Sequence, residues 1–213
     1  NKKNTLIDTS PDLRNQLLSQ KVTTIDDVLY THCHADQTHG INDLRIFYLK
    51  KTKKIPVYCD KVTSKYLTKN FSYCFIKKYD YPAILTLKSL KKSFTLGEQG
   101  KKIHIKAIKV RHGLIDSIAY IINNKIAYIS DANSFYNKDY DCFKDLKYLI
   151  IDCLRYYKHP SHFNLEDVLR ITKSLKPKKT ILTNLHSDLD YNQLLKILPN
   201  NIKPGYDGLS VKI

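Results

Sequence analysis

The chain has 213 residues, enough for one sizeable α/β domain with a buried core, and it contains no apolar run near the roughly 20 residues of a membrane-spanning helix. Its formal net charge of +16 indicates either a polyanionic partner such as RNA or a solvated, lysine-rich surface. The five cysteines are odd in number and form no CxxC pair, which argues against a disulfide framework and favours reduced thiols in a cytoplasmic protein.

In the first half of the chain, predicted strands alternate with predicted helices. These elements are a strand in residues 4–10, a helix in 11–20, a strand in 26–32, an amphipathic segment in 40–50, a strand in 55–59 and a helix in 60–71. Ser10 is the expected N-cap of the first helix, with Pro11 in its first turn, and Asp60 is the expected N-cap of the last one.

The second half of the chain is richer in predicted strands. These elements are a half-buried strand in residues 101–110, a hairpin in 117–130, a fully apolar strand in 147–154, a helix in 164–176, a strand in 179–185 and a helix in 190–198. Asn123 and Asn124 form the expected turn of the hairpin, and Asn164 is a plausible helix cap. No repeat or linker divides the chain, so we predict a single α/β domain over residues 1–213, with a sheet-based core covered by helices.

Histidine and aspartate side chains gather where the predicted strands end. The stretch "YTHCHADQTHG" places three histidines and an aspartate at the end of one strand, and single residues follow three later strands. The whole set is His32, His34, Asp36, His39, His112, Asp131 and His186. Imidazole nitrogens and carboxylate oxygens are good ligands for Zn²⁺, and they also serve Mn²⁺ or Fe²⁺. This ordered set therefore predicts a metal site.

The motifs resemble those of the metallo-β-lactamase superfamily, whose signature is HxHxDH followed by distant His, Asp and His. The subgroup that contains the phosphoribosyl cyclic phosphodiesterase matches best, through "LIDTSPDLR", "VLYTHCHADQTHGINDLR", "VRHG", "AYISDAN", "DCLRYYKHPSHFNLEDVL" and "LTNLHSDLDY". The resemblance implies a four-layer αβ/βα sandwich with metal ions at one edge. The strand and Gly-rich turn with which the family begins have no counterpart here, so we expect a truncated N-terminus and a fold without its first strand.

Residue by residue, the resemblance implies a site for two divalent ions, Zn²⁺ or Mn²⁺. Its ligands would be His32, His34 and His112 for the first ion, Asp36 and His186 for the second, and Asp131 as a bridge. His162 matches a family histidine placed near the substrate phosphate and is a candidate general acid. Asp36 would orient its ion and assist with the proton, so Asp36 and His162 are the predicted catalytic residues.

Gln37 departs from the signature, because the family has a histidine at this position. An amide oxygen is a neutral and weaker donor to a transition metal than imidazole, so we expect weaker affinity at the second site or a shift toward a harder ion. His39 is two residues away, and we expect it to have a structural rather than a ligating role.

The favoured function is a metal-dependent phosphodiesterase that acts on small cyclic phosphodiesters, with no membrane association and with a homodimer left open. One alternative is an RNA-processing nuclease of the tRNA 3′ endonuclease type, which the positive charge supports. Only five of the 36 basic residues are Arg, however, and phosphate-reading proteins often favour Arg, so a nucleic-acid partner is not favoured. A further alternative is a metal-binding protein with a degenerate second site and no catalysis.

Overall fold

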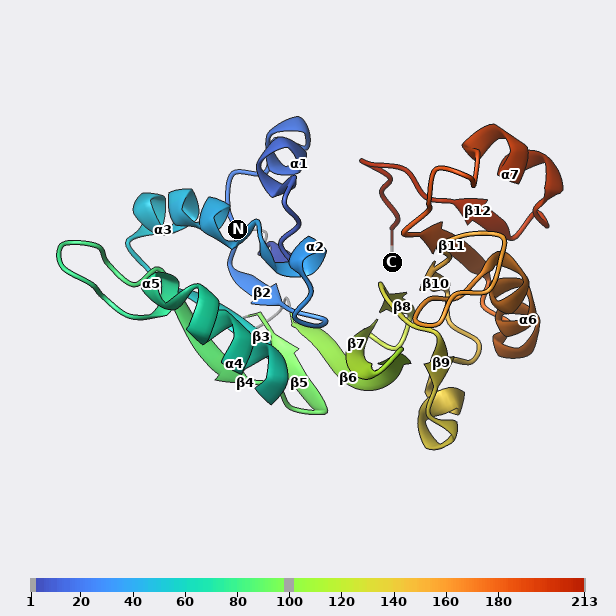
Figure 1. Ribbon diagram of the computed structural model, residues 1–213, viewed down its shortest axis with the longest axis horizontal. Helices are drawn as coiled ribbons and strands as arrows, with labels where there is room; N and C mark the ends of the chain where they lie inside the picture. The colour runs from blue at the N-terminus through green and yellow to red at the C-terminus, as the bar shows by residue number, and fades with distance from the viewer. Residues whose placement is uncertain (1–2, 98–101, 213) are drawn as a thin grey trace. The chain divides into compact units, whose positions relative to one another are not determined.

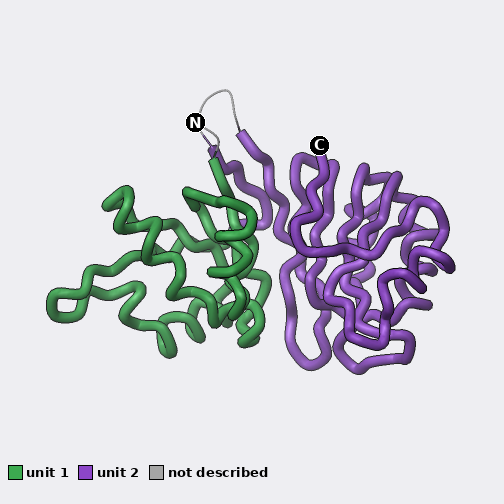
Figure 2. Tube along the Cα trace, turned by 90° about the horizontal axis from the view of Figure 1, so that it is seen from above, with its two compact units in different colours: residues 1–90 green, residues 91–213 purple. Residues whose placement is uncertain are grey.

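The computed structural model describes residues 3–97 and 102–212. The chain divides into two compact units, Asn1–Leu90 and Lys91–Ile213, which Figure 2 colours separately. Each unit has its own sheet and its own hydrophobic core. The predicted α/β class, with two sheets accompanied by helices, is confirmed, and the single-domain organisation over 1–213 stays a prediction. No helix within the described ranges has the length and apolar character to cross a membrane.

Unit 1 is built on a four-stranded sheet in the order β1-β2-β3-β4, in which all strands run parallel (Figure 1). Its elements are β1 (Thr5–Ile7), α1 (Leu13–Ser19), β2 (Asp27–Leu29), α2 (Ala35–Thr38), η1 (Ile41–Leu44), α3 (Arg45–Lys51), β3 (Ile55–Cys59), α4 (Lys61–Asn70), α5 (Ser72–Phe75) and β4 (Leu85–Ser89). Parallel neighbours need crossover connections, and the helices between the strands supply them. The carboxyl ends of the strands therefore meet at one edge of the sheet.

The core of unit 1 joins that sheet to its helices. Val28 on β2 and Val57 on β3 are register partners and fully buried. Leu13 of α1, Phe47 of α3 and Leu67 of α4 belong to the same buried cluster. This packing fixes the end of β2, from which the histidine-rich loop emerges.

Unit 2 contains a mixed sheet in the order β12-β11-β10-β8-β7-β6-β5. Its elements are β5 (Ser93–Leu96), β6 (Ile103–His112), β7 (Ile115–Ile122), β8 (Ile126–Ile129), β9 (Ser134–Phe135), η2 (Asn137–Phe143), β10 (Tyr148–Asp152), α6 (Leu165–Leu175), β11 (Lys179–Thr183), α7 (Tyr191–Ile197) and β12 (Ile202–Pro204). Strands β5 to β8 pair antiparallel, while β8, β10, β11 and β12 pair parallel. Strand β9 pairs with β6 beside the main path.

Local sequence signals set several of these elements. The side chain of Asp60 accepts a hydrogen bond from the Thr63 N–H and caps α4, as predicted. Asn164 caps α6 in the same way through the Asp167 N–H. The β7–β8 hairpin turns at Asn123 and Asn124, both with φ of 52°, and the Lys125 N–H donates to the Ile122 carbonyl across this turn.

The start of the first helix was predicted wrongly. Helix α1 begins at Leu13, its N-cap is Asp12, and no side chain caps it. The Ser10 hydroxyl instead donates to the side chain of Gln16. A turn closed by the Leu13 N–H and the Ser10 carbonyl takes up the residues that were assigned to the first helical turn.

Candidate metal centre

The loop that follows β2 is held by a buried carboxylate. Asp8 lies just after β1, is 6% exposed, and has a left-handed backbone with φ of 58°. Its Oδ1 accepts the Thr31 N–H at 2.7 Å, and its Oδ2 accepts the Thr31 hydroxyl at 2.8 Å. Two adjacent strand ends of the parallel sheet are thereby tied together at the point where the histidines begin.

These bonds determine how His32 is oriented. The Thr31 hydroxyl gives its proton to Asp8, so toward His32 Nδ1, at 3.0 Å, it acts as an acceptor. The proton of the neutral ring then sits on Nδ1, and the lone pair is on Nε2. Nε2 faces Nδ1 of His34 at 3.0 Å. The two imidazoles of the HxH motif therefore direct ring nitrogens at one point, although His32 is buried and His34 is exposed.

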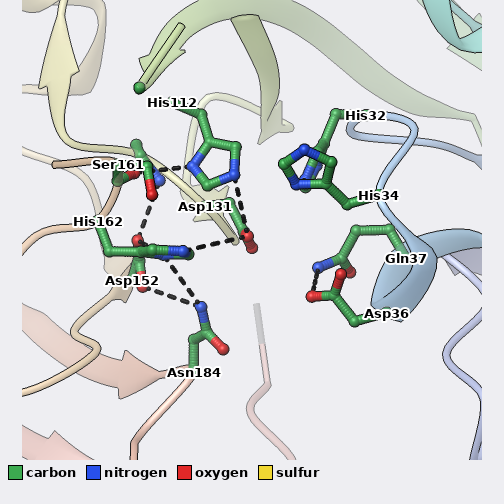
Figure 3. A network of polar contacts seen from close by, with 12 residues as sticks. His32, His34, Asp36, Gln37, His112, Asp131, Asp152, Ser161, His162 and Asn184 are labelled. Carbon is green, nitrogen blue, oxygen red and sulfur yellow. Dashed lines mark hydrogen bonds and ion pairs between the residues drawn. The ribbon is translucent and has the colours of Figure 1, made fainter. Parts of the chain in front are cut away.

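Asp36 and Gln37 follow on the short helix α2. The Gln37 Nε2 donates to the Asp36 Oδ2 at 2.6 Å, so the amide presents its nitrogen to the carboxylate (Figure 3). His39 turns to α4, where its Nε2 lies 3.1 Å from the Tyr66 hydroxyl, and its ring makes an edge contact with Phe71. These contacts fit the structural role expected for His39.

Unit 2 places His112 and Asp131 together at one edge of its sheet, where β6 and β8 end on either side of β7. His112 is the last residue of β6, Asp131 is the second residue after β8, and each is 3% exposed. The His112 Nδ1–H donates to the carbonyl of Ser161 at 2.7 Å, which leaves the lone pair on Nε2. This Nε2 lies 3.7 Å from the Asp131 Oδ2 (Figure 3).

His162 contacts a buried carboxylate that sequence reasoning missed. The Asp152 Oδ2 pairs with His162 Nδ1 at 2.8 Å and also accepts the Ala132 N–H at 3.0 Å. The Asn184 Nδ2 donates to the Asp152 Oδ1 at 3.2 Å. Asp152 is fully buried, and burial raises its pKa, although the hydrogen bond from His162 acts in the opposite direction. Asp152 ends the apolar stretch of β10, and an aspartate inside such a stretch was the available signal.

The structure places His186 apart from this cluster. Its side chain is 59% exposed, and its Nδ1 lies 3.1 Å from the Asp188 Oδ1. The position directly after β11 belongs to Asn184, which contacts both Asp152 and His162 (Figure 3). Arg155 donates to the backbone carbonyls of Tyr157 and Lys158 and so shapes the loop before α6.

The donor atoms within each unit fit a divalent metal ion. Unit 1 supplies His32 and His34 and unit 2 supplies His112 and Asp131, all residue types that could hold such an ion. Two ligands about 2.0 to 2.2 Å from one ion lie roughly 3 to 3.5 Å apart. The pairs measured within the units, at 3.0 Å and 3.7 Å, are close to this spacing. The hydrogen bonds at the Nδ1 atoms of His32 and His112 also leave the correct nitrogen with its lone pair.

The chain belongs to the family described as the beta-lactamase superfamily domain, whose model matches residues 3–184. It is 28% identical to a crystal structure described as a new diphosphatase from the PhnP family, with a TM-score of 0.86 over 96% of this chain and 77% of that one. The short form of human tRNase Z has the same fold, with a TM-score of 0.70 and 15% identity over 98% of this chain and 88% of that one.

A curated relative is the octanoyltransferase of Porphyromonas gingivalis (strain ATCC BAA-308 / W83). It is 30% identical to this chain over 214 aligned residues, which cover 99% of this chain and 42% of that protein. The chain thus spans less than half the length of this relative, whose name describes the longer protein.

Proposed function

We propose that this chain is a metal-dependent hydrolase of phosphoric diesters and that its substrates are small cyclic phosphodiesters. The observation that carries the proposal is the similarity to the PhnP-family diphosphatase, because it extends over 96% of the chain at 28% identity. The donor geometry around His32 and His112 and the contacts of His162 give this similarity a chemical basis.

In this proposal, as the family resemblance implies, the ligands of a transition-metal ion are His32, His34, His112 and Asp131. A bound ion of this kind lowers the pKa of a coordinated water and neutralises charge on a phosphate oxygen. Thr31 and the Ser161 carbonyl hold the two buried imidazoles in the ligating orientation. The side chains are thus oriented before the substrate arrives, so they need little reorganisation during the reaction.

His162 is the proposed general acid. Its Nδ1 is fixed by Asp152, so its Nε2 is the atom that can give a proton to the leaving alkoxide. Asp152 has a second function here, because a carboxylate stabilises the protonated ring before the proton leaves. The His162 side chain is 14% exposed, so the proton is held in a largely enclosed position.

The test compares two substrates with different leaving groups. Hydrolysis of a ribose cyclic phosphodiester releases an alkoxide that needs a proton, whereas bis-p-nitrophenyl phosphate releases a phenolate that does not. We expect His162→Ala to lower kcat for the cyclic substrate by roughly 10²- to 10⁴-fold and to affect the nitrophenyl ester much less. His34→Ala should abolish the turnover of both substrates, and unchanged turnover in that variant would refute the assignment. His104→Ala is the matched control, because His104 lies on β6 with His112 and contacts Ser93 on the neighbouring strand.

A second candidate is an RNA-processing nuclease. The specific observation in its favour is the charge on α4, where Lys61, Lys65 and Lys69 recur every fourth residue and are all exposed. The likeness to human tRNase Z supports the fold alone. RNA binding that weakens steeply with salt, together with the loss of that binding in a Lys61→Glu/Lys65→Glu variant, would favour this function. Salt-independent behaviour would leave the small diester as the substrate, and metal binding without turnover of either substrate would point to a non-catalytic protein.

A further inference from the structure

We propose that this protein holds one transition-metal ion per chain and that side-chain amides, Gln37 and Asn184, stand where ligands of a second ion would be needed. The proposal rests on the proposed metal-dependent function, and it concerns the stoichiometry of that site. It departs from the sequence-based expectation of a second ion held by Asp36 and His186.

The first observation is the contact between Gln37 and Asp36. An ionised carboxylate only accepts hydrogen bonds, so the short contact of 2.6 Å requires the amide to present its nitrogen. That nitrogen carries protons and offers no lone pair to a metal. The amide oxygen, the one atom of Gln37 that could ligate, is therefore turned away from Asp36. In this orientation Gln37 donates a hydrogen bond to the Asp36 carboxylate and does not act as a second ligand beside it.

The second observation comes independently from unit 2. Asn184 directly follows β11 and has φ of 61°, and its Nδ2 donates to the Asp152 Oδ1. This amide also presents its nitrogen, and it lies 3.4 Å from the Nδ1 of His162. His186, the residue expected as a ligand, is 59% exposed and faces Asp188. The strand end that should deliver an imidazole thus delivers an amide that is engaged with a carboxylate.

The donor set left for a second ion is poor in nitrogen. In unit 2 the Nδ1 of His112 is bonded to the Ser161 carbonyl, and the Nδ1 of His162 is bonded to Asp152. The Nε2 of His162 lies 3.9 Å from the Asp131 Oδ2, but it is the proton donor in the proposed function. A second ion would otherwise depend on the carboxylates of Asp36 and Asp131 and on amide oxygens. Such an all-oxygen set suits Mg²⁺ or Ca²⁺ and binds Zn²⁺ weakly, because borderline-soft ions prefer imidazole or thiolate. The tight site therefore takes one ion, and its proposed ligands are His32, His34, His112 and Asp131.

Metal stoichiometry on reloaded protein tests the inference. The full chain is stripped with a chelator, reloaded with excess Zn²⁺, desalted, and measured by elemental mass spectrometry. We expect one ion per chain in the wild type and in His186→Ala. We expect Gln37→His and Asn184→His to raise the count toward two, and Gln37→Ala, which removes the amide without adding a ligand, to leave it at one. Because histidine tolerates positive φ better than most residues, Asn184→His is a feasible variant, and Gln37→His is an independent one.

The outcomes separate this inference from the proposed function. Two tightly held ions in the wild type, or a lower count in His186→Ala, would overturn the inference, and turnover of a phosphodiester would then leave the function standing. One ion without turnover of any phosphodiester would support the inference and refute the function. No retained ion, with no Zn²⁺-dependent rise in Tm, would refute both, because a ligand that binds only the folded state must stabilise it.

Discussion

Replacing Asp152 with asparagine tests the role assigned to the buried carboxylate. Three donors reach this side chain, from His162 at 2.8 Å, Ala132 at 3.0 Å and Asn184 at 3.2 Å. Asparagine keeps one accepting oxygen and turns an N–H₂ group toward at least one of those donors. Leaving a buried donor unsatisfied costs about 1 to 3 kcal/mol, so we expect Asp152→Asn to lower the free energy of unfolding by that amount.

The same substitution should lower kcat with little change in KM. His162 loses the acceptor that orients its ring and stabilises its protonated form, and an equivalent change in a His–carboxylate pair of a serine protease costs about 10⁴-fold. We expect a loss on the order of 100-fold or more on a cyclic phosphodiester. The assays are urea unfolding at pH 7 and steady-state kinetics on the metal-loaded protein.

A matched control is Asp141→Asn, which removes an exposed carboxylate paired with Lys144. Surface pairs of this kind contribute about 0 to 1 kcal/mol, and the site does not involve this one, so its kcat should stay at the wild-type value. An Asp152→Asn protein with wild-type stability and wild-type kcat would refute the reasoning, because it would show that the three donors find other partners and that His162 needs no carboxylate.

Three further predictions concern stability and reactivity. A Cβ at Gly40 would lie 1.9 Å from the Ser10 carbonyl oxygen, so Gly40→Ala should lower the free energy of unfolding by about 2 to 4 kcal/mol. Thermal unfolding measures this, and an unchanged Tm would contradict the close approach. Burial of Asp26 acts to raise its pKa, but hydrogen bonds from Lys51 and from the Asn4 N–H have the larger combined effect, so the pKa of Asp26 is lowered. The stabilisation that results from this low pKa is fully present above the unfolded value of about 3.9 and is lost as pH falls through the folded pKa. Asp26→Asn should therefore lower the free energy of unfolding at pH 7 but not near pH 2. A loss that is the same at both pH values would contradict this reasoning. Finally, brief alkylation of the native protein at pH 8, read by peptide mass spectrometry, should label the exposed Cys142 first, and equal labelling of the buried thiols would count against the fold.

Local signals in the sequence were sufficient for much of the fold. The caps Asp60 and Asn164 and the Asn123-Asn124 turn act within a few residues of their own position, so a short window contains the physics that sets them. The prediction for Ser10 was wrong, because its hydroxyl donates to Gln16 and helix α1 begins only at Leu13. A short window shows that Ser10 can cap a helix but not that its hydroxyl will bond Gln16 instead.

The sequence was sufficient to place site residues where a possible ligand comes at or just after the end of a strand. It was not sufficient where the backbone conformation decides which side chain enters the cluster. His112 ends β6 and Asp131 follows β8, and the two side chains lie close together at one edge of the sheet. The choice between Asn184 and His186 depends on the left-handed backbone at Asn184, which breaks the alternation of an extended segment. A pattern of residue types carries no information about that single dihedral angle, so the sequence pointed to the histidine and the structure places the asparagine in the cluster.

Two buried aspartates orient histidines of this site through hydrogen bonds. Asp8 acts on His32 through Thr31, and Asp152 acts on His162 directly. A buried carboxylate is costly unless several donors reach it, and these two receive hydrogen bonds from backbone and side-chain donors of their own unit. Because the donors come from strand ends that the sheets already fix, folding itself compensates the desolvation. Each unit can therefore orient its share of the imidazoles through its own hydrogen bonds.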